Sequence, residues 1–95
     1  MKQIEVEFDL GKPGDENVTF TVNWPSGFDL PRVGEWVEFD SAGGVIPDFQ
    51  VNILKRHFTT EGKAIVLAYA TPSEPFTLSA LNALKKNPLI KEVGE

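Results

Sequence analysis

The sequence has no cysteine and only one histidine, His57. The missing cysteine excludes a disulfide framework and thiol chemistry, and it leaves a zinc site to carboxylates, which seldom hold zinc without histidine or cysteine. None of the four serines stands in a Gly-x-Ser-x-Gly elbow, and the glycines lack the spacing of a phosphate-binding loop. We therefore expect no catalytic residue, no metal site and no cofactor, and a protein that is not an enzyme.

Long apolar runs are also missing. The run at residues 64–70, AIVLAYA, is far shorter than the roughly 20 residues that a membrane-spanning helix needs. The first ten residues alternate acidic and apolar side chains, whereas a signal peptide has a basic start and a continuous apolar stretch. Together with the absence of disulfide staples, this pattern predicts a protein of the cytoplasm with no membrane partner.

The length of the chain limits the number of domains, and the distribution of its charge limits the classes of partner. Ninety-five residues, of which 41% are hydrophobic, predict a single domain over residues 1–95 with one modest core. Residues 1–48 hold ten acidic and three basic side chains, whereas residues 49–95 hold four acidic and six basic ones. The acidic half repels phosphate backbones, so we do not expect nucleic acid as the partner. A local basic patch of Lys55, Arg56 and Lys63 is the one exception.

Two segments near the N-terminus alternate strictly between apolar and polar residues. The apolar members are Ile4, Val6, Phe8 and Leu10 in the first segment, and Val18, Phe20, Val22 and Trp24 in the second. Such alternation places one set of side chains on each face of a strand. Turn-forming residues fill 11–16, so the two segments predict an antiparallel hairpin with one buried and one wet face.

Three more strands and a helix are expected after this hairpin. A strand over 35–40 would turn Val37 and Phe39 inward. A strand over 48–58 shows a one-residue slip in its alternation, which indicates a bulge. A hairpin loop over 59–63 with Gly62 in the left-handed region leads into 64–70, expected to be the most buried strand. Leu67→Ala in that strand would then cost about 2–5 kcal/mol as a core cavity.

A helix is expected over 78–86, capped by Thr77 and packed through a stripe of Leu78, Leu81 and Leu84. Pro88 ends it, and the tail over 89–93 is either a short edge strand or a packed extension. The predicted fold is mainly β with some α: a small open barrel or SH3-like roll of five or six antiparallel strands, with one C-terminal helix.

The segment FDLPRVGEWVEFD, followed by FQVNILKRHF and AIVLAYA, resembles small uncharacterised bacterial β-barrel proteins. In those proteins a proline and a glycine–acid pair open a strand, and two further strands follow. The resemblance covers roughly residues 28–70. It implies a fold class and brings no catalytic residue with it.

Five residues are candidates for binding a partner: Phe28, Arg32, Trp36, Arg56 and His57. Phe28 stands in a loop, and Trp36 has the opposite parity to the inward Val37. Exposed aromatic side chains near an arginine are typical of interface anchors. The alternative is that Phe28 and Trp36 pack against the helix or close one end of the barrel. His57 is either an edge residue without chemistry or, with Arg56, part of an anion-binding pair.

These residues favour a non-enzymatic module that binds a protein partner. The second reading is a structural or assembly protein, such as a phage-type connector or a homo-oligomer subunit, in which an edge strand or the acidic hairpin face meets a second copy. The third is a small ligand-binding protein, which would need a closed pocket.

Overall fold

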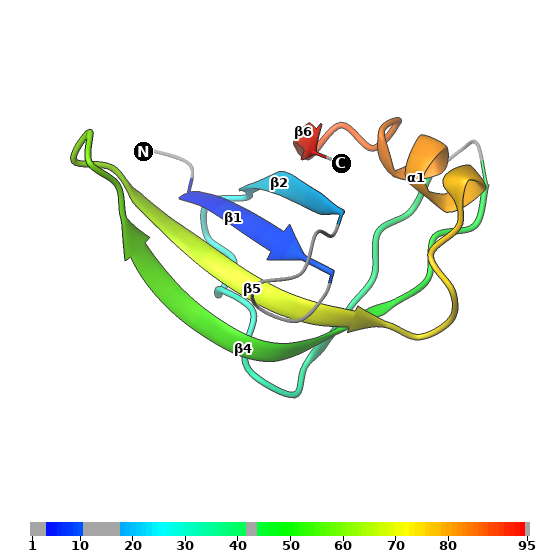
Figure 1. Cartoon of the computed structure of the whole chain (residues 1–95), viewed down its shortest axis with the longest axis horizontal. Coiled ribbons are helices and arrows are strands. Elements are labelled where there is room, and N and C mark those ends of the chain that lie inside the picture. The colour runs from blue at the N-terminus through cyan, green and yellow to red at the C-terminus, as the bar shows by residue number, and fades with distance from the viewer. Residues whose placement is uncertain (1–3, 11–17, 42–43, 95) are drawn as a thin grey trace.

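The structure is a computed structural model that describes residues 4–10, 18–41 and 44–94. Six strands form one curved sheet in the order β3-β4-β5-β1-β2-β6, which closes about half of a barrel, and one helix lies at one end of it (Figure 1). The elements are β1 Ile4–Asp9, β2 Thr19–Trp24, β3 Trp36–Val37, β4 Phe49–Phe58, β5 Ala64–Pro72, α1 Leu78–Leu84 and β6 Ile90–Gly94. The predicted mainly-β class with one C-terminal helix is confirmed.

The N-terminal hairpin is confirmed as well. β1 and β2 pair antiparallel with Val6 opposite Val22 and Phe8 opposite Phe20, and all four side chains are buried. The predicted turn at 11–16 lies outside the described residues. At the other end of the chain, β6 pairs antiparallel with β2, so the tail is a short edge strand.

β4 and β5 form the longest hairpin of the molecule, a strongly curved ribbon that runs along one side of Figure 1. The predicted slip is a register shift between Val51 and Ile53. Before it the inward residues of β4 are Phe49 and Val51, and after it Leu54 packs against the core. The connecting loop has Gly62 at φ 84°, a conformation that glycine adopts without strain, as expected.

The relative direction of one pair of neighbouring strands differs from the prediction. β1 and β5 are parallel, with Val6 beside Val66 and Phe8 beside Ala68, so the sheet is mixed and not wholly antiparallel. The alternation of apolar residues determines which side chains face the core, but it carries no information about which strand lies beside which. Here β5 inserts between β4 and β1, and the hairpin geometry of β4–β5 decides its direction.

β5 is not buried throughout, contrary to the prediction. Val66, Ala68 and Ala70 are buried, whereas Ile65, Leu67 and Tyr69 are half-buried on the opposite side. The core covers only one face of the sheet, so even a continuous apolar run has an inner and an outer set. The core prediction for Leu67 is therefore wrong.

The third strand is shorter than predicted. β3 contains only Trp36 and Val37, which pair with Gln50 and Phe49 of β4. Phe39 is still buried as expected, at 7% exposure, but it packs from irregular chain. Its ring meets Phe8 and Phe20 edge-on, with centroids 5.7 Å apart in both pairs. The pairing with β4 therefore ends at Val37, and the irregular chain after it places the Phe39 ring in the core.

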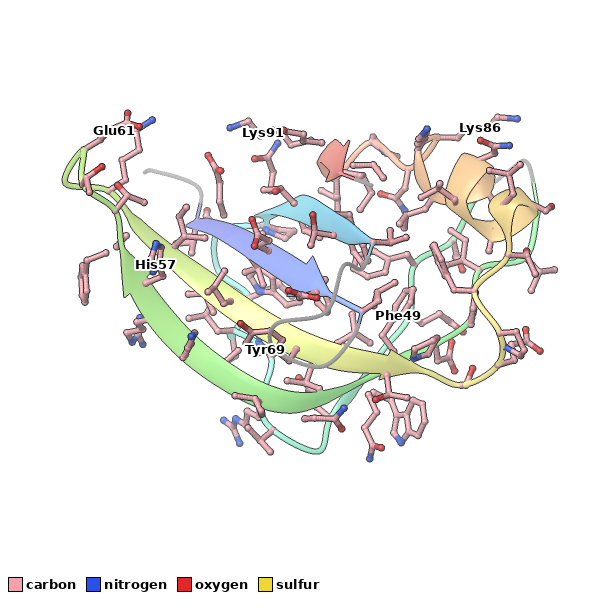
Figure 2. The ribbon with its side chains drawn as sticks, in the orientation of Figure 1. Phe49, His57, Glu61, Tyr69, Lys86 and Lys91 are labelled. Atoms are coloured by element: carbon pink, nitrogen blue, oxygen red, sulfur yellow. The ribbon has the colours of Figure 1, made fainter. Side chains whose placement is uncertain are left out.

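α1 begins at its predicted cap, where the backbone N–H of Ala80 donates to Thr77 Oγ1 at 3.1 Å. It ends at Leu84, two residues before the predicted end. The packed side chains are Ala80, Leu81, Ala83 and Leu84, and Leu78 is 71% exposed, so the predicted leucine stripe is wrong at its first member. In Figure 2 the helix lies toward the same end of the molecule as the labelled Phe49, and its Ala83 and Leu84 belong to the same core cluster as Phe49.

Candidate partner-binding surface

An apolar groove lies at the seam where the two margins of the curved sheet approach each other. Its lining comes from β3 at one margin and from β2 with the segment before β6 at the other. The groove has a volume of about 320 Å³. The lining residues are Val22, Trp24, Pro25, Phe28, Val37, Glu38, Phe39, Asp40, Asn87 and Leu89. We call this surface the seam groove.

Phe28 is the most exposed of the large apolar side chains in this groove, at 72%. It lies on a turn that follows β2, with Gly27 at φ 90° and the backbone N–H of Phe28 donating to the oxygen of Pro25 at 3.4 Å. The indole Nε1–H of Trp24 donates to the backbone oxygen of Asp29 at 2.9 Å. These bonds hold Phe28 beside the groove and leave its ring largely in water.

Polar contacts fix the wall that the segment before β6 forms. The side-chain amide of Asn87 donates to the backbone oxygen of Asp40 at 2.7 Å, and its carbonyl accepts from the N–H of Leu89 at 2.9 Å. Leu89 in turn accepts from the backbone N–H of Asn23 at 2.8 Å, which connects this wall to β2. The ionisable side chains of the lining are Glu38 and Asp40, and none of the described lining residues is basic. The groove is thus apolar with an acidic rim.

Arg32 and Trp36 do not line the groove. Arg32 is exposed on the same loop as Phe28, where its guanidinium lies 3.9 Å from the carboxylate of Asp29. Trp36 is 54% exposed and stands opposite Gln50, on the face of the sheet away from the core. Of the two expected arrangements, the structure therefore shows the exposed one for both Phe28 and Trp36.

Arg56 and His57 lie far from these residues and on opposite sides of β4. Seven residues of strand separate Gln50 from His57, which is roughly 20 Å. Arg56 lines a concavity of about 700 Å³ below the β4–β5 loop, together with Glu61, Lys63 and Lys91. His57 points to the other face, in register with Ile65. The five predicted partner-binding residues therefore do not form one patch, and the two neighbours do not form one anion site.

The side of the sheet away from the core carries a graded pattern of charge, and we call it the outer face. β4 contributes Ile53, Lys55 and His57, β5 contributes Ile65, Leu67 and Tyr69, and β1 contributes Glu5, Glu7 and Asp9. Basic, apolar and acidic stripes thus lie on three adjacent strands. In Figure 2 the labelled His57 and Tyr69 mark this stretch of the long hairpin.

The acids of the outer face differ in their surroundings. Partial burial and the neighbouring Asp9 raise the pKa of Glu7, and the charge of His57 opposes that rise. Burial also raises the pKa of Asp9, whose Oδ1 has no hydrogen-bond partner in the described part of the chain. Glu5 instead accepts a hydrogen bond from Lys91 Nζ at 2.8 Å, which raises the pKa of that lysine. In the described part of the chain, no cation forms an ion pair with the carboxylates of Glu7 and Asp9.

Sequence reasoning missed most of the groove, because its walls come from segments that are distant in the chain. Alternation placed Trp24 on the inward face of β2, but nothing in the pattern brings Leu89 or Val37 beside it. The signal that was available is the pairing of an exposed Phe28 with the nearby Trp24 and Pro25. The acidic stripe of the outer face follows from the wet side of the predicted hairpin, but the apolar stripe beside it does not, because a continuous apolar run such as 64–70 predicts burial on both sides.

Within residues 4–10, 18–41 and 44–94, no three histidine, cysteine or acidic side chains lie close enough together to bind a metal ion. Among the same residues, no helix has the length and apolar character to cross a membrane. Comparison with protein-family models, with curated proteins and with solved structures finds no match to this chain.

Proposed function

We propose that this chain is a non-enzymatic protein-interaction module that binds a segment of a partner protein in the seam groove. The observation that carries the proposal is the exposed Phe28 ring beside an apolar groove with an acidic rim. The occupant is a protein segment that presents a large apolar side chain next to lysine or arginine. The cysteine-free sequence supports a site of action in the cytoplasm.

The exposed ring of Phe28 can contribute binding energy when a partner covers it. Removing a phenylalanine ring from water contributes about 1.5–3 kcal/mol of favourable free energy. Most of that contribution is absent in the free chain, because the Phe28 ring is largely exposed. The hydrogen bonds that Pro25 and Asp29 accept already order the loop in the free chain. Little conformational entropy would therefore be lost when a partner covers the ring. Aromatic side chains, phenylalanine included, are enriched in protein interfaces relative to the rest of the surface.

The acidic rim of the seam groove selects the charge of the occupant. Glu38 and Asp40 line the groove, and both side chains are exposed. Their carboxylates favour a basic neighbour on the occupant and repel an acidic one, which adds specificity and a faster association. An apolar side chain that fills the groove would meet Trp24, Val37 and Leu89, which are partly buried in the free chain. The combination favours a basic and apolar segment over an acidic one.

The test is selection from a displayed peptide library, followed by titration of the selected peptides against the full chain. We expect selected peptides to combine a bulky apolar residue with lysine or arginine, and to shift the backbone amide resonances of Trp24 and Leu89. Phe28→Ser should weaken binding at least tenfold. Phe58→Ser is the matched control, because Phe58 is 74% exposed and does not line the groove.

Equal binding by the Phe28 and Phe58 variants would overturn the proposal, and so would selection of acidic peptides. The double variant Glu38→Lys with Asp40→Lys separates the contribution of the acidic rim from that of the Phe28 ring. It should lose the preference for basic peptides but keep the effect of Phe28→Ser. Stabilisation of the chain by a metabolite that fills the groove would instead favour a small ligand-binding protein.

A further inference from the structure

We propose that the outer face binds a second copy of this chain, so that two sheets pack face to face about a two-fold axis that runs along β5. This surface is separate from the seam groove, so the inference does not depend on the proposed function. It rests on the order of charge across the sheet and on the register that aligns those charges.

Five residues from five strands form one row across the outer face. Lys55 pairs with Leu67, Leu67 with Glu7, Glu7 with Thr21, and Thr21 with Glu92. The row therefore has a cation on one side of a leucine and a carboxylate on the other side. A second row, with His57 and Ile65, repeats the order of a basic side chain beside an apolar one.

A two-fold axis determines which charges meet. If the axis runs parallel to the strands and passes over β5, midway between the two sheets, the row of one copy faces the same row of the second copy in the reverse order. Lys55 then faces Glu7 of the second copy, Glu7 faces the second Lys55, and the two Leu67 side chains meet on the axis. An axis perpendicular to the strands would place Lys55 on Lys55 and Glu7 on Glu7. The charge order therefore favours the axis along β5, and each attraction occurs twice.

Lys55 and Glu7 make no ion pair with another described residue, which fits this arrangement. The ion pairs among the described residues join Arg32 to Asp29 and Lys91 to Glu5, and neither uses Lys55 or Glu7. Lys55 Nζ lies 5.7 Å from the centre of the Tyr69 ring, so its side chain already leans over the apolar stripe. Packed sheets lie about 10 Å apart, a distance that two leucines from facing sheets can fill.

The free edge of β4 is a poorer site for a second copy. β3 pairs only with Gln50 and Phe49, and beyond Val51 this edge has no strand partner among the described residues. Antiparallel pairing of two β4 edges would bring the Lys55, Arg56 and His57 of both copies together. Like charges directly opposite each other destabilise a strand pair, which is how natural sheets protect their edges.

We expect a weak dimer that depends on salt. The stripes span three strands and about five residues of length, roughly 14 Å by 17 Å, which is smaller than a standard interface. The third row, with Ile53, Tyr69 and Asp9, brings no opposite charges together. The attraction is therefore concentrated on few charges at the rim of an apolar stripe, and added salt screens such charges.

The test is sedimentation equilibrium of the full chain over a wide range of protein concentration, at low and at high salt. The wild-type chain should form a dimer that weakens with salt. Lys55→Glu and Glu7→Lys should each raise the dissociation constant roughly tenfold, because each turns two attractions into two repulsions. An equal mixture of the two variants should restore the dimer, since both facing pairs are then opposite in charge.

Leu67→Glu should abolish the dimer, and circular dichroism should show that the variant remains folded. The control is Leu78→Glu, which places the same charge at an exposed leucine of α1 and should leave the dimer unchanged. A wild-type chain that is monomeric at every concentration overturns the inference. A dimer that persists in Leu67→Glu, or a mixture that fails to restore it, overturns it as well. None of these results bears on peptide binding at Phe28.

Discussion

Phe8 stacks on Phe20 across the β1–β2 hairpin, with ring centroids 5.0 Å apart and ring planes within 1° of each other. Phe39 and Phe49 pack on the same two rings, so all four form one aromatic cluster. The hairpin that alternation predicts is thus also the centre of the core.

Replacing Phe20 by alanine should therefore cost about 3–5 kcal/mol of the free energy of unfolding. The ring is 1% exposed, and its loss leaves a cavity against Phe8, Phe39 and Phe49. Urea denaturation followed by fluorescence measures the change. Phe58→Ala is the control, because its exposed ring should cost less than about 0.5 kcal/mol. Similar losses in the two variants would contradict this packing.

Three leucines should differ in their contribution according to their position. Leu84→Ala should cost about 2–5 kcal/mol, since Leu84 is fully buried between α1 and the sheet. Leu67→Ala should cost about 1 kcal/mol, because that side chain is half-buried on the outer face. Leu78→Ala should change little. Denaturation of dilute samples, where any dimer dissociates, gives the comparison, and a larger loss at Leu67 than at Leu84 would show that the core lies on the other side of β5.

The difference between Leu67 and Leu84 also shows how far the sequence could predict the fold. Strict alternation in 4–10 and 18–24 specifies one buried face, so this hairpin follows from the chain itself. In 64–70 every residue is apolar, and no periodicity indicates the buried side. Only the inward position of Val66 and Ala68 beside Val6 and Phe8 decides it, and that contact depends on the packing of strands distant in sequence.

For the candidate binding surfaces too, the sequence predicts which single side chains are exposed but not which of them lie together. Parity correctly placed Trp36 opposite to the inward Val37, and the turn residues around Gly27 left Phe28 exposed. The grouping of residues was not predictable in this way. Arg56 and His57 are neighbours in sequence but face opposite sides of β4, whereas Trp24 and Leu89 are distant in sequence and share a groove. Contacts across the seam arise from the curvature of the whole sheet, which no local pattern encodes.

The start of α1 provides a local prediction. Thr77→Ala should cost about 1 kcal/mol, because the backbone N–H of Ala80 loses the hydroxyl oxygen that accepts its hydrogen bond. Thr77→Ser keeps that oxygen and should retain most of the stability. Thermal unfolding of the three proteins is the measurement. Equal destabilisation by alanine and serine would mean that the methyl group of Thr77, and not the cap, stabilises this end of the helix.

The pH dependence of stability should reveal the acids of the outer face. Partial burial and the nearby Asp9 raise the pKa of Glu7, so the folded chain binds a proton there more readily than the unfolded chain does. Where the folded state holds more protons, the free energy of unfolding falls as the pH rises. The stabilisation that protonated Glu7 provides is thus fully present below its ordinary pKa of 4.5 and is lost as the pH rises through its folded pKa.

Glu7→Gln should remove the contribution of Glu7 to this dependence, leave that of Asp9, and raise the stability of the dilute monomer near neutral pH. Urea denaturation at a series of pH values from mildly acidic to neutral is the measurement. Glu61→Gln is the matched control, because Glu61 is exposed at the tip of the β4–β5 hairpin (Figure 2). A Glu7→Gln curve parallel to that of the wild type would show that His57, whose charge lowers the pKa of Glu7, cancels the effect of burial.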